Sequence, residues 1–251
     1  MQLGIEDRVA LVMGASKGIG HAIAAALARE GARVALASRS AERIEQAAAA
    51  IGERVYGFAA DTADLERMAA LPGEVAGELG SPVEILVTNT GGPPPGQALA
   101  HGLDAWRDAY DNLVLAPRVL IEASLPAMRE RGWGRIVNVG SSSTEEPIPG
   151  LALSNAHRRA LTGFLKTLSR EVAAEGITVN DVATGRFATD RLAANWGGRE
   201  EMERGAVEGI PAGRLGRPQE YGDLVAFLAS ERAGYLTGTS IPIDGGLLRS
   251  I

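Results

Sequence analysis

The chain has 251 residues, a length that suits one large α/β domain and leaves too little for two enzyme-sized domains with a linker. A hydrophobic content of 45% with 22% charged residues is ordinary for a globular protein and disfavours both disorder and a membrane class. The net charge of −6 is spread along the chain, which argues against nucleic-acid binding. The absence of cysteine excludes disulfides and thiol catalysis. It also fits a reducing compartment, and the cytoplasm is the default expectation.

The predicted elements alternate along the chain. The N-terminus lacks the features of a signal peptide, and no apolar run approaches the ~18 residues of a membrane span. Short apolar runs predict buried parallel strands at 8–13, 33–37, 83–87 and 135–139. Helical periodicity predicts helices at 19–30, 41–51, 63–79, 103–131 and 154–175. This alternation predicts one doubly wound, Rossmann-like α/β domain over residues 1–251, with a mostly parallel sheet covered by helices on both faces.

Two segments depart from the regular pattern. Pro117 lacks an amide donor and crowds the preceding turn, so the long helix over 103–131 either bends or ends there. Residues 187–210 have weak periodicity and several glycines. We expect a mobile insertion in this second segment, at a place that often covers the substrate in such folds.

A glycine-rich turn follows the first predicted strand and opens the first predicted helix. It comprises Gly14, Ser16, Lys17, Gly18, Ile19 and Gly20. Glycines permit a tight turn and let backbone amides approach a pyrophosphate, whose charge is favoured at a helix N-terminus. The turn therefore predicts a dinucleotide site, although any one of these glycines can equally serve the turn alone.

The turn is the first of several landmarks that resemble the short-chain dehydrogenase/reductase family, in order and at similar separations. The later ones look like the family's adenine-contacting aspartate, its Asn-Asn-Ala-Gly turn, its nicotinamide segment and its C-terminal end, at Asp61, 88–91, 179–185 and 237–246. The resemblance covers nearly the whole chain, and local motifs are similar to a divergent branch of 3-oxoacyl-carrier-protein reductases. It implies a nucleotide cofactor held by Gly14, Ser16, Lys17, Gly18, Ile19, Gly20, Arg39, Asp61, Asn89, Gly91, Arg158 and Gly185.

The end of the second strand bears on the choice of cofactor. A free ribose is usually held there by an acidic residue, whereas a 2′-phosphate needs positive charge. The strand ends in Ser38, Arg39 and Ser40, with no carboxylate, and Lys17 offers a second cation. We expect NADP in preference to NAD; the alternative is that Arg39 is a solvated surface arginine.

The catalytic residues of the family are altered on this alignment. The family uses a tyrosine as acid, a serine that polarises the substrate oxygen, a lysine that lowers the tyrosine pKa, and an asparagine in a proton relay. The resemblance puts the serine at Ser141, the tyrosine position at Ser154 and the lysine position at Arg158. The relay position falls at Leu113, and a one-residue slip would restore Asn112.

These replacements change what the site can do. A serine hydroxyl is far less acidic than a phenol of pKa about 10, and arginine stays charged above pH 12, so Arg158 can stabilise an oxyanion but cannot usefully release a proton. General acid–base catalysis contributes typically 10²–10⁴-fold. His157, Glu145 and Glu146 are nearby substitutes, but His157 is turned ~100° from Arg158 on a helix, and loop carboxylates are commonly just solvated.

Two functions remain open at this stage. One is an atypical NADP(H)-dependent oxidoreductase that acts on a small-molecule carbonyl or alcohol. The other is a nucleotide-binding protein without turnover, which acts as a sensor or structural partner. The resemblance implies a homo-oligomer, a dimer or tetramer, in which the apolar stripe of the 154–175 helix is either core or interface. Three scattered histidines predict no metal site, and neither a nucleic acid nor a membrane is expected as a partner.

Overall fold

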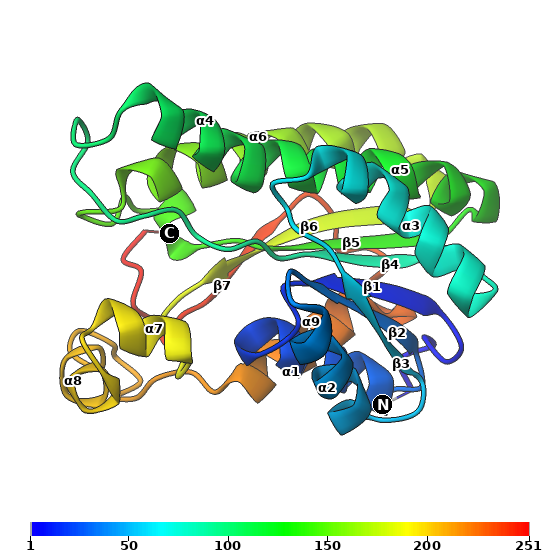
Figure 1. Ribbon diagram of the computed structural model, residues 1–251, viewed down its shortest axis with the longest axis horizontal. Coiled ribbons are helices and arrows are strands. Elements are labelled where there is room, and N and C mark those ends of the chain that lie inside the picture. The colour runs from blue at the N-terminus through cyan, green and yellow to red at the C-terminus, as the bar shows by residue number, and fades with distance from the viewer. Residues whose placement is uncertain (1, 251) are drawn as a thin grey trace.

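A computed structural model describes residues 2–250, except the side chain of Asn195. Its centre is a parallel sheet with the strand order β3-β2-β1-β4-β5-β6-β7 (Figure 1). The strands are β1 Val9–Met13, β2 Arg33–Ser38, β3 Val55–Ala59, β4 Ile85–Thr88, β5 Gly134–Val139, β6 Ile177–Thr184 and β7 Ser240–Ile243. The order reverses direction between β1 and β4, which is the switch point where doubly wound sheets bind ligands.

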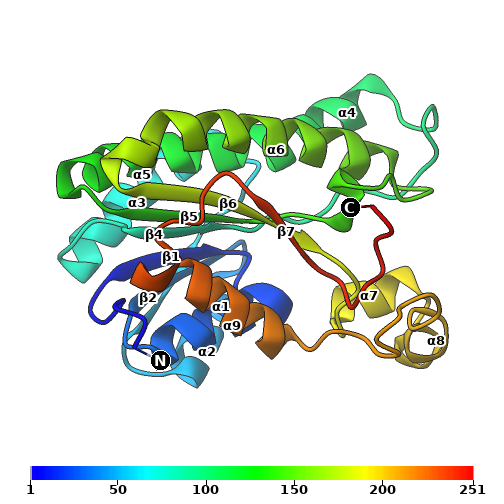
Figure 2. The ribbon, with the colours of Figure 1, turned by 180° about the vertical axis from the view of Figure 1, so that it is seen from behind.

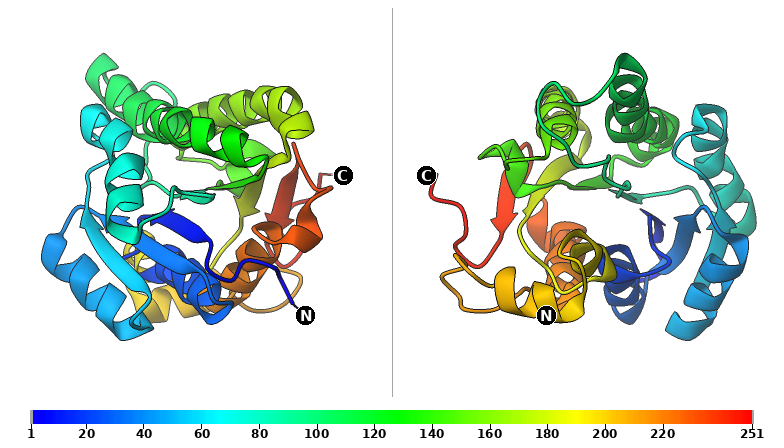
Figure 3. Two further views of the ribbon diagram at one scale, coloured as in Figure 1. Left: turned by 90° about the vertical axis from the view of Figure 1, so that its right-hand side faces the viewer. Right: turned by 60° about the vertical axis from the view of Figure 1, so that its left-hand side comes forward.

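Helices cover both faces of the sheet, as the end-on views in Figure 3 show. One face carries α1 Gly18–Arg29, α2 Ala41–Ile51 and α9 Pro218–Leu228. The other carries α3 Leu65–Leu79, α4 Leu103–Tyr110, α5 Ala116–Arg131 and α6 Ala152–Val172. The predicted doubly wound, Rossmann-like domain is confirmed.

Alternation along the central strands builds a separate apolar core on each face. In β1, Ala10 and Val12 pack toward α1 and α9, while Leu11 and Met13 pack toward α3 and α5. Because both faces are buried, the strand is apolar throughout, which is why short apolar runs marked the strands in the sequence. The apolar stripe of α6, including Leu161, lies within the second core.

The long helix predicted over 103–131 is interrupted before its proline. A π-helical turn at Asp111–Leu115 separates α4 from α5, and Pro117 lies in the first turn of α5. A proline is tolerated there because the amides of a first helical turn need no partner within the helix. The π-helical turn that interrupts the helix therefore lies about one turn before Pro117.

The segment 187–210 contains two short helices, α7 Asp190–Asn195 and α8 Arg199–Gly205. They stand apart from the sheet, beyond the end of β6, in Figures 1 and 2. A bridge between Phe187 and Gly216 closes the base of the segment. Its mobility remains a prediction. No helix within residues 2–250 has the length and apolar character needed to cross a membrane.

Candidate active site

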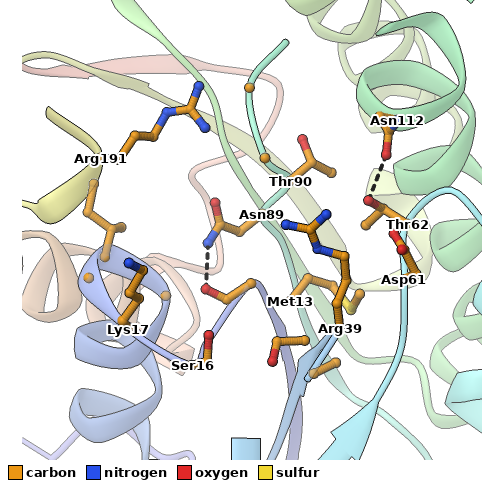
Figure 4. A pocket seen from close by; sticks show the side chains of 18 of the residues that line it. Met13, Ser16, Lys17, Arg39, Asp61, Thr62, Asn89, Thr90, Asn112 and Arg191 are labelled. Carbon is orange, nitrogen blue, oxygen red and sulfur yellow. Dashed lines mark hydrogen bonds between the residues drawn. The ribbon is translucent and has the colours of Figure 1, made fainter. Parts of the chain in front are cut away.

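A cleft of about 780 Å³ lies at the carboxyl ends of β1, β2 and β4, and α7 borders it on one side. Five stretches of chain contribute most of its wall: the glycine-rich turn, the end of β2, the residues after β3, the residues after β4, and the start of α7. Figure 4 shows Lys17 and Arg191 on one side of the cleft and Asp61, Thr62 and Asn112 on the other. The cleft thus occupies the switch point of the sheet.

Close packing holds the glycine-rich turn against the end of β4. Gly14 and Gly18 have φ values of 60° and 62°, in the left-handed region that favours glycine. A Cβ on Gly20 would collide with the Gly14 carbonyl oxygen and lie 2.8 Å from Asn89 Nδ2. Asn89 Nδ2 also donates to the Gly14 carbonyl oxygen at 3.4 Å. These contacts leave a cradle of backbone beside the N-terminus of α1, with the shape that a pyrophosphate requires.

The end of β2 forms the second part of the cleft. Ser38 also lines the cleft, and its Oγ is buried and has no hydrogen-bond partner among the described residues. Arg39 and Arg43 are exposed beside it, and no ion pair joins either to another described side chain. Asp61 lies across from them, where its Oδ1 accepts a hydrogen bond from the Ala63 amide at 3.1 Å. These residues fit the adenosine end of a dinucleotide.

Most of the residues expected to hold the cofactor line this cleft: Gly14, Ser16, Lys17, Gly18, Ile19, Gly20, Arg39, Asp61, Asn89 and Gly91. Arg158 and Gly185 do not line it. A Cβ on Gly185 would lie 2.6 Å from the Asp244 Cα, so this glycine lets the end of β6 approach the end of β7. Packing between the ends of β6 and β7 therefore explains why position 185 is a glycine.

The three residues expected to be catalytic lie between the end of β5 and the start of α6. Ser141 caps a 3₁₀ turn, where its Oγ accepts a hydrogen bond from the Ser143 amide at 3.1 Å. Ser154 is buried in the first turn of α6, and its hydroxyl bonds no described residue. Arg158, one turn further on, donates from Nη1 to the Val139 carbonyl oxygen at 3.1 Å. The fold therefore places the Arg158 guanidinium beside the strand end that leads to Ser141.

A row of polar side chains crosses four strands beneath this group. Thr88, Asn138, Asp181 and Ser240 are cross-strand neighbours on β4, β5, β6 and β7. Thr88 Oγ1 donates to Asn138 Oδ1 at 2.8 Å, and Asn138 Nδ2 donates to Asp181 Oδ1 at 2.6 Å. Ser240 Oγ donates to Asp181 Oδ2 at 3.4 Å. The row satisfies both oxygens of a carboxylate that is only 2% exposed.

Arg158 and Asp181 form the charged centre of this region. Burial raises the pKa of the Asp181 carboxyl, while its hydrogen bond from Asn138 and the nearby Arg158 charge oppose that rise. Burial lowers the pKa of the Arg158 guanidinium, the charge of Arg191 lowers it further, and Asp181 acts in the opposite direction. The guanidinium therefore remains a cation that faces one buried carboxylate.

His157 and Glu146, which the sequence offered as substitutes for the tyrosine, are held by other contacts. His157 is buried, its Nδ1 lies 2.8 Å from the Leu153 carbonyl oxygen, and its ring centroid lies 5.1 Å from that of Trp106. Glu146 accepts hydrogen bonds from the backbone amides of Arg249 and Ser250, which lower its pKa. These contacts assign both side chains to packing and to docking of the C-terminal segment.

The two candidates for the relay position lie at the π-helical turn. Leu113 is 1% exposed, whereas Asn112 donates from Nδ2 to the Asp108 carbonyl oxygen at 2.9 Å. Asn112 Oδ1 accepts a hydrogen bond from Thr62 Oγ1 at 2.8 Å. Asn112 therefore links the helix to the chain after β3, and both Asn112 and Leu113 line the cleft.

Sequence reasoning missed two residues. Asp181 lies in β6, in which every residue but the last is buried, and a carboxylate in such a strand is itself a signal of a polar partner. Arg191 lies within the weakly periodic segment 187–210, where the sequence does not indicate which way a side chain points. Within residues 2–250, no group of three or more acidic or histidine side chains is arranged to hold a metal ion.

Comparisons with known proteins agree with this geometry. Residues 14–248 match a family described as Enoyl-(Acyl carrier protein) reductase. The chain is 35% identical to 3-oxoacyl-(acyl-carrier-protein) reductase FabG of Haemophilus influenzae, over 98% of this chain and 100% of that protein. It is 38% identical to nodulation protein G of Azospirillum brasilense, over 97% and 99%.

Two solved structures are also similar. L-sorbose reductase from Gluconobacter frateurii, complexed with NADPH and L-sorbose, has a TM-score of 0.94 and 32% identity over 100% of both chains. YwfH, an NADPH-dependent reductase involved in bacilysin biosynthesis, has a TM-score of 0.93 and 30% identity over 98% of this chain and 100% of that one. The chain therefore belongs to the short-chain dehydrogenase/reductase family, whose members are oxidoreductases that act on carbonyl and alcohol substrates.

Proposed function

We propose that the protein is an NADP(H)-dependent oxidoreductase for a carbonyl or alcohol substrate that works without the tyrosine acid of its family. In this proposal Ser154 stands at the tyrosine position and Arg158 at the lysine position. The supporting observation is the Arg158 guanidinium, which bonds the Val139 carbonyl oxygen beside Asp181, at the strand end that leads to Ser141. A fixed cation at this place can stabilise negative charge on a substrate oxygen.

The side chains divide the chemistry as follows. A bound nicotinamide would supply or accept the hydride. The Ser141 hydroxyl donates a hydrogen bond to the substrate oxygen, and the Arg158 cation stabilises the charge that develops there. Ser154 contributes a further hydrogen bond but is a weak acid, so water delivers the proton. Loss of a positioned acid lowers the rate by about 10²–10⁴-fold relative to a site that has one.

The proposed cofactor is NADP rather than NAD. Arg39 and Arg43 stand at the end of β2 without an ion pair to another described side chain, and the β2 end carries no carboxylate to hold a free ribose. Guanidinium groups bind phosphate in a bidentate manner. The NADPH found in the L-sorbose reductase complex supports the same choice.

Fluorescence titration with NADPH and NADH, followed by turnover assays on a broad panel of ketones and quinones, tests the proposal. We expect tighter binding of NADPH and slow oxidation of it by some carbonyl compounds. Binding of NADPH without turnover of any compound in the panel would refute the proposal that the protein is an enzyme. If turnover occurs, Ser141→Ala should reduce kcat strongly, and an unchanged kcat would refute the role of Ser141.

A nucleotide-binding protein without turnover is the second candidate, as a sensor or a structural partner. The proposed replacement of the family tyrosine by Ser154 favours it, because a serine hydroxyl is a far weaker acid and the nearby Asp181 carboxyl is held by hydrogen bonds from Asn138 and Ser240. A triple variant, Ser154→Tyr with Arg158→Lys and Leu113→Asn, separates the two cases. Carbonyl reduction gained by this variant in an inactive parent would support the second candidate and the alignment together.

The resemblance further supports a cytoplasmic homo-oligomer, a dimer or tetramer. In the structure, helices α5 and α6 lie on the same face of the sheet (Figure 2). The resemblance implies that this pair of helices meets its copy across a two-fold axis. Light scattering during gel filtration tests this, and a monomer at micromolar concentration would refute the oligomer.

A further inference from the structure

We propose that Arg191 binds an anionic group of the substrate, so that the protein acts on carbonyl compounds that carry a carboxylate. This inference rests on the proposed oxidoreductase function and adds the substrate class to it. It assigns specificity to α7, the first helix of the segment that borders the cleft.

Packing fixes the direction of Arg191. A Cβ on Gly92 would collide with the Arg191 guanidinium and lie 2.8 Å from its Cζ. Gly92 is not among the glycines with positive φ, so its backbone would accept any residue. What requires glycine at this position is the space that the guanidinium occupies. Figure 4 shows the Arg191 side chain reaching from α7 into the cleft near Asn89 and Thr90.

The charge of Arg191 is not neutralised by its neighbours. Asp190, the adjacent carboxylate, pairs with Lys17 at 3.2 Å and with Arg199 at 3.7 Å. No hydrogen bond or ion pair joins Arg191 to another described side chain, and burial of its guanidinium lowers its pKa. Arg158 is near enough for the two cations to repel each other. A substrate carboxylate in the cleft would neutralise the charge of Arg191 and accept bidentate hydrogen bonds from its guanidinium.

The position of Arg191 points to the substrate more than to the nucleotide phosphates. The cradle for a pyrophosphate lies at the glycine-rich turn, where Gly18 packs against the Thr189 side chain. Arg191 instead lies against Gly92, and its charge acts on Arg158, which belongs to the group with Ser141 and Ser154. An anion held by Arg191 is therefore on the side where a carbonyl oxygen meets these hydroxyls.

The test uses binding as well as rate. Malonate, which cannot be reduced, is titrated calorimetrically into the wild type, Arg191→Gln, Arg191→Lys and Arg204→Gln. Arg204 lies on α8 outside the cleft lining and pairs with Glu201, so its variant is a control for the loss of one positive charge. Acetoacetate and methyl acetoacetate, which differ mainly in the anionic group, are then compared as substrates by kcat/KM.

We expect malonate to bind the wild type and the Arg204 variant equally, and to bind Arg191→Gln about 10- to 100-fold more weakly, as loss of a charge-assisted hydrogen bond implies. Arg191→Lys should lie between them because it loses the bidentate geometry. Wild type should prefer acetoacetate to its ester, and Arg191→Gln should lose this preference while NADPH binding stays unchanged. Malonate binding that is absent from the wild type or insensitive to Arg191→Gln would overturn the inference, as would a weakened affinity for NADPH instead. If no carbonyl compound is turned over, the oxidoreductase proposal fails, while the malonate titration still decides the role of Arg191.

Discussion

Replacing Gly91 with alanine should weaken nucleotide binding and leave the fold intact. Gly91 lines the cleft, its φ is not positive, and a Cβ there would meet no atom within 4 Å. The free energy of unfolding should therefore change by less than about 0.5 kcal/mol. A nucleotide packed against the turn after β4 must make room for the new methyl group, and such overpacking costs about 1–3 kcal/mol. The Kd for NADPH should rise roughly 5- to 150-fold.

Two matched variants make this result interpretable. Gly20→Ala collides with the Gly14 carbonyl within the protein itself, so both stability and NADPH affinity should fall. Gly73→Ala, on α3 and outside the cleft, also meets no atom within 4 Å and should retain affinity, with stability unchanged or raised by up to about 1 kcal/mol. Fluorescence titration and urea unfolding measure the two quantities. Wild-type affinity in the Gly91 variant would refute the placement of the nucleotide against this turn.

Three further predictions concern the buried side chains of Asp181 and Tyr221 and the exposed side chain of Arg39. Because burial raises the pKa of Asp181, its ionised form destabilises the fold, and wild-type stability should fall as the pH rises from the ordinary carboxyl pKa through the raised value. Asp181→Asn should flatten this part of the curve of unfolding free energy against pH; a parallel curve would contradict the titration of Asp181. Tyr221→Phe removes a hydroxyl bonded to Thr184 Oγ1 at 2.9 Å and to the Val182 carbonyl, so urea unfolding should show a loss of about 0.5–1.5 kcal/mol. No loss would mean that these bonds contribute nothing net. Arg39→Ala should weaken NADPH binding but not NADH binding, and equal weakening in the two titrations would remove Arg39 from the 2′-phosphate.

The fold followed from the sequence because its signals are local. The apolar run at 8–13 predicted β1 to within one residue, and the periodicity over 41–51 predicted both ends of α2. The π-helical turn at Asp111–Leu115 left no such signal, since it depends on how α4 and the turn itself pack on α6. Pro117 marked the irregularity only approximately.

The site was predicted less completely, because its contacts join distant parts of the chain. The glycine-rich turn and Arg39 could be located from local motifs, and they line the cleft. The position of Asp181 beneath Arg158 depends on strand register and on the docking of α6, which no single segment encodes. The same holds for the contact between Arg191 and Gly92.

The row of Thr88, Asn138, Asp181 and Ser240 has a consequence for folding as well as for chemistry. Parallel strands rich in valine and isoleucine can pair in several alignments of similar apolar content. A slip of one residue between β5 and β6 would turn Asp181 away from Asn138 and leave a carboxylate among apolar side chains on the opposite face. The polar row thus penalises misaligned pairing of β5 and β6 and helps to define a single register for the sheet.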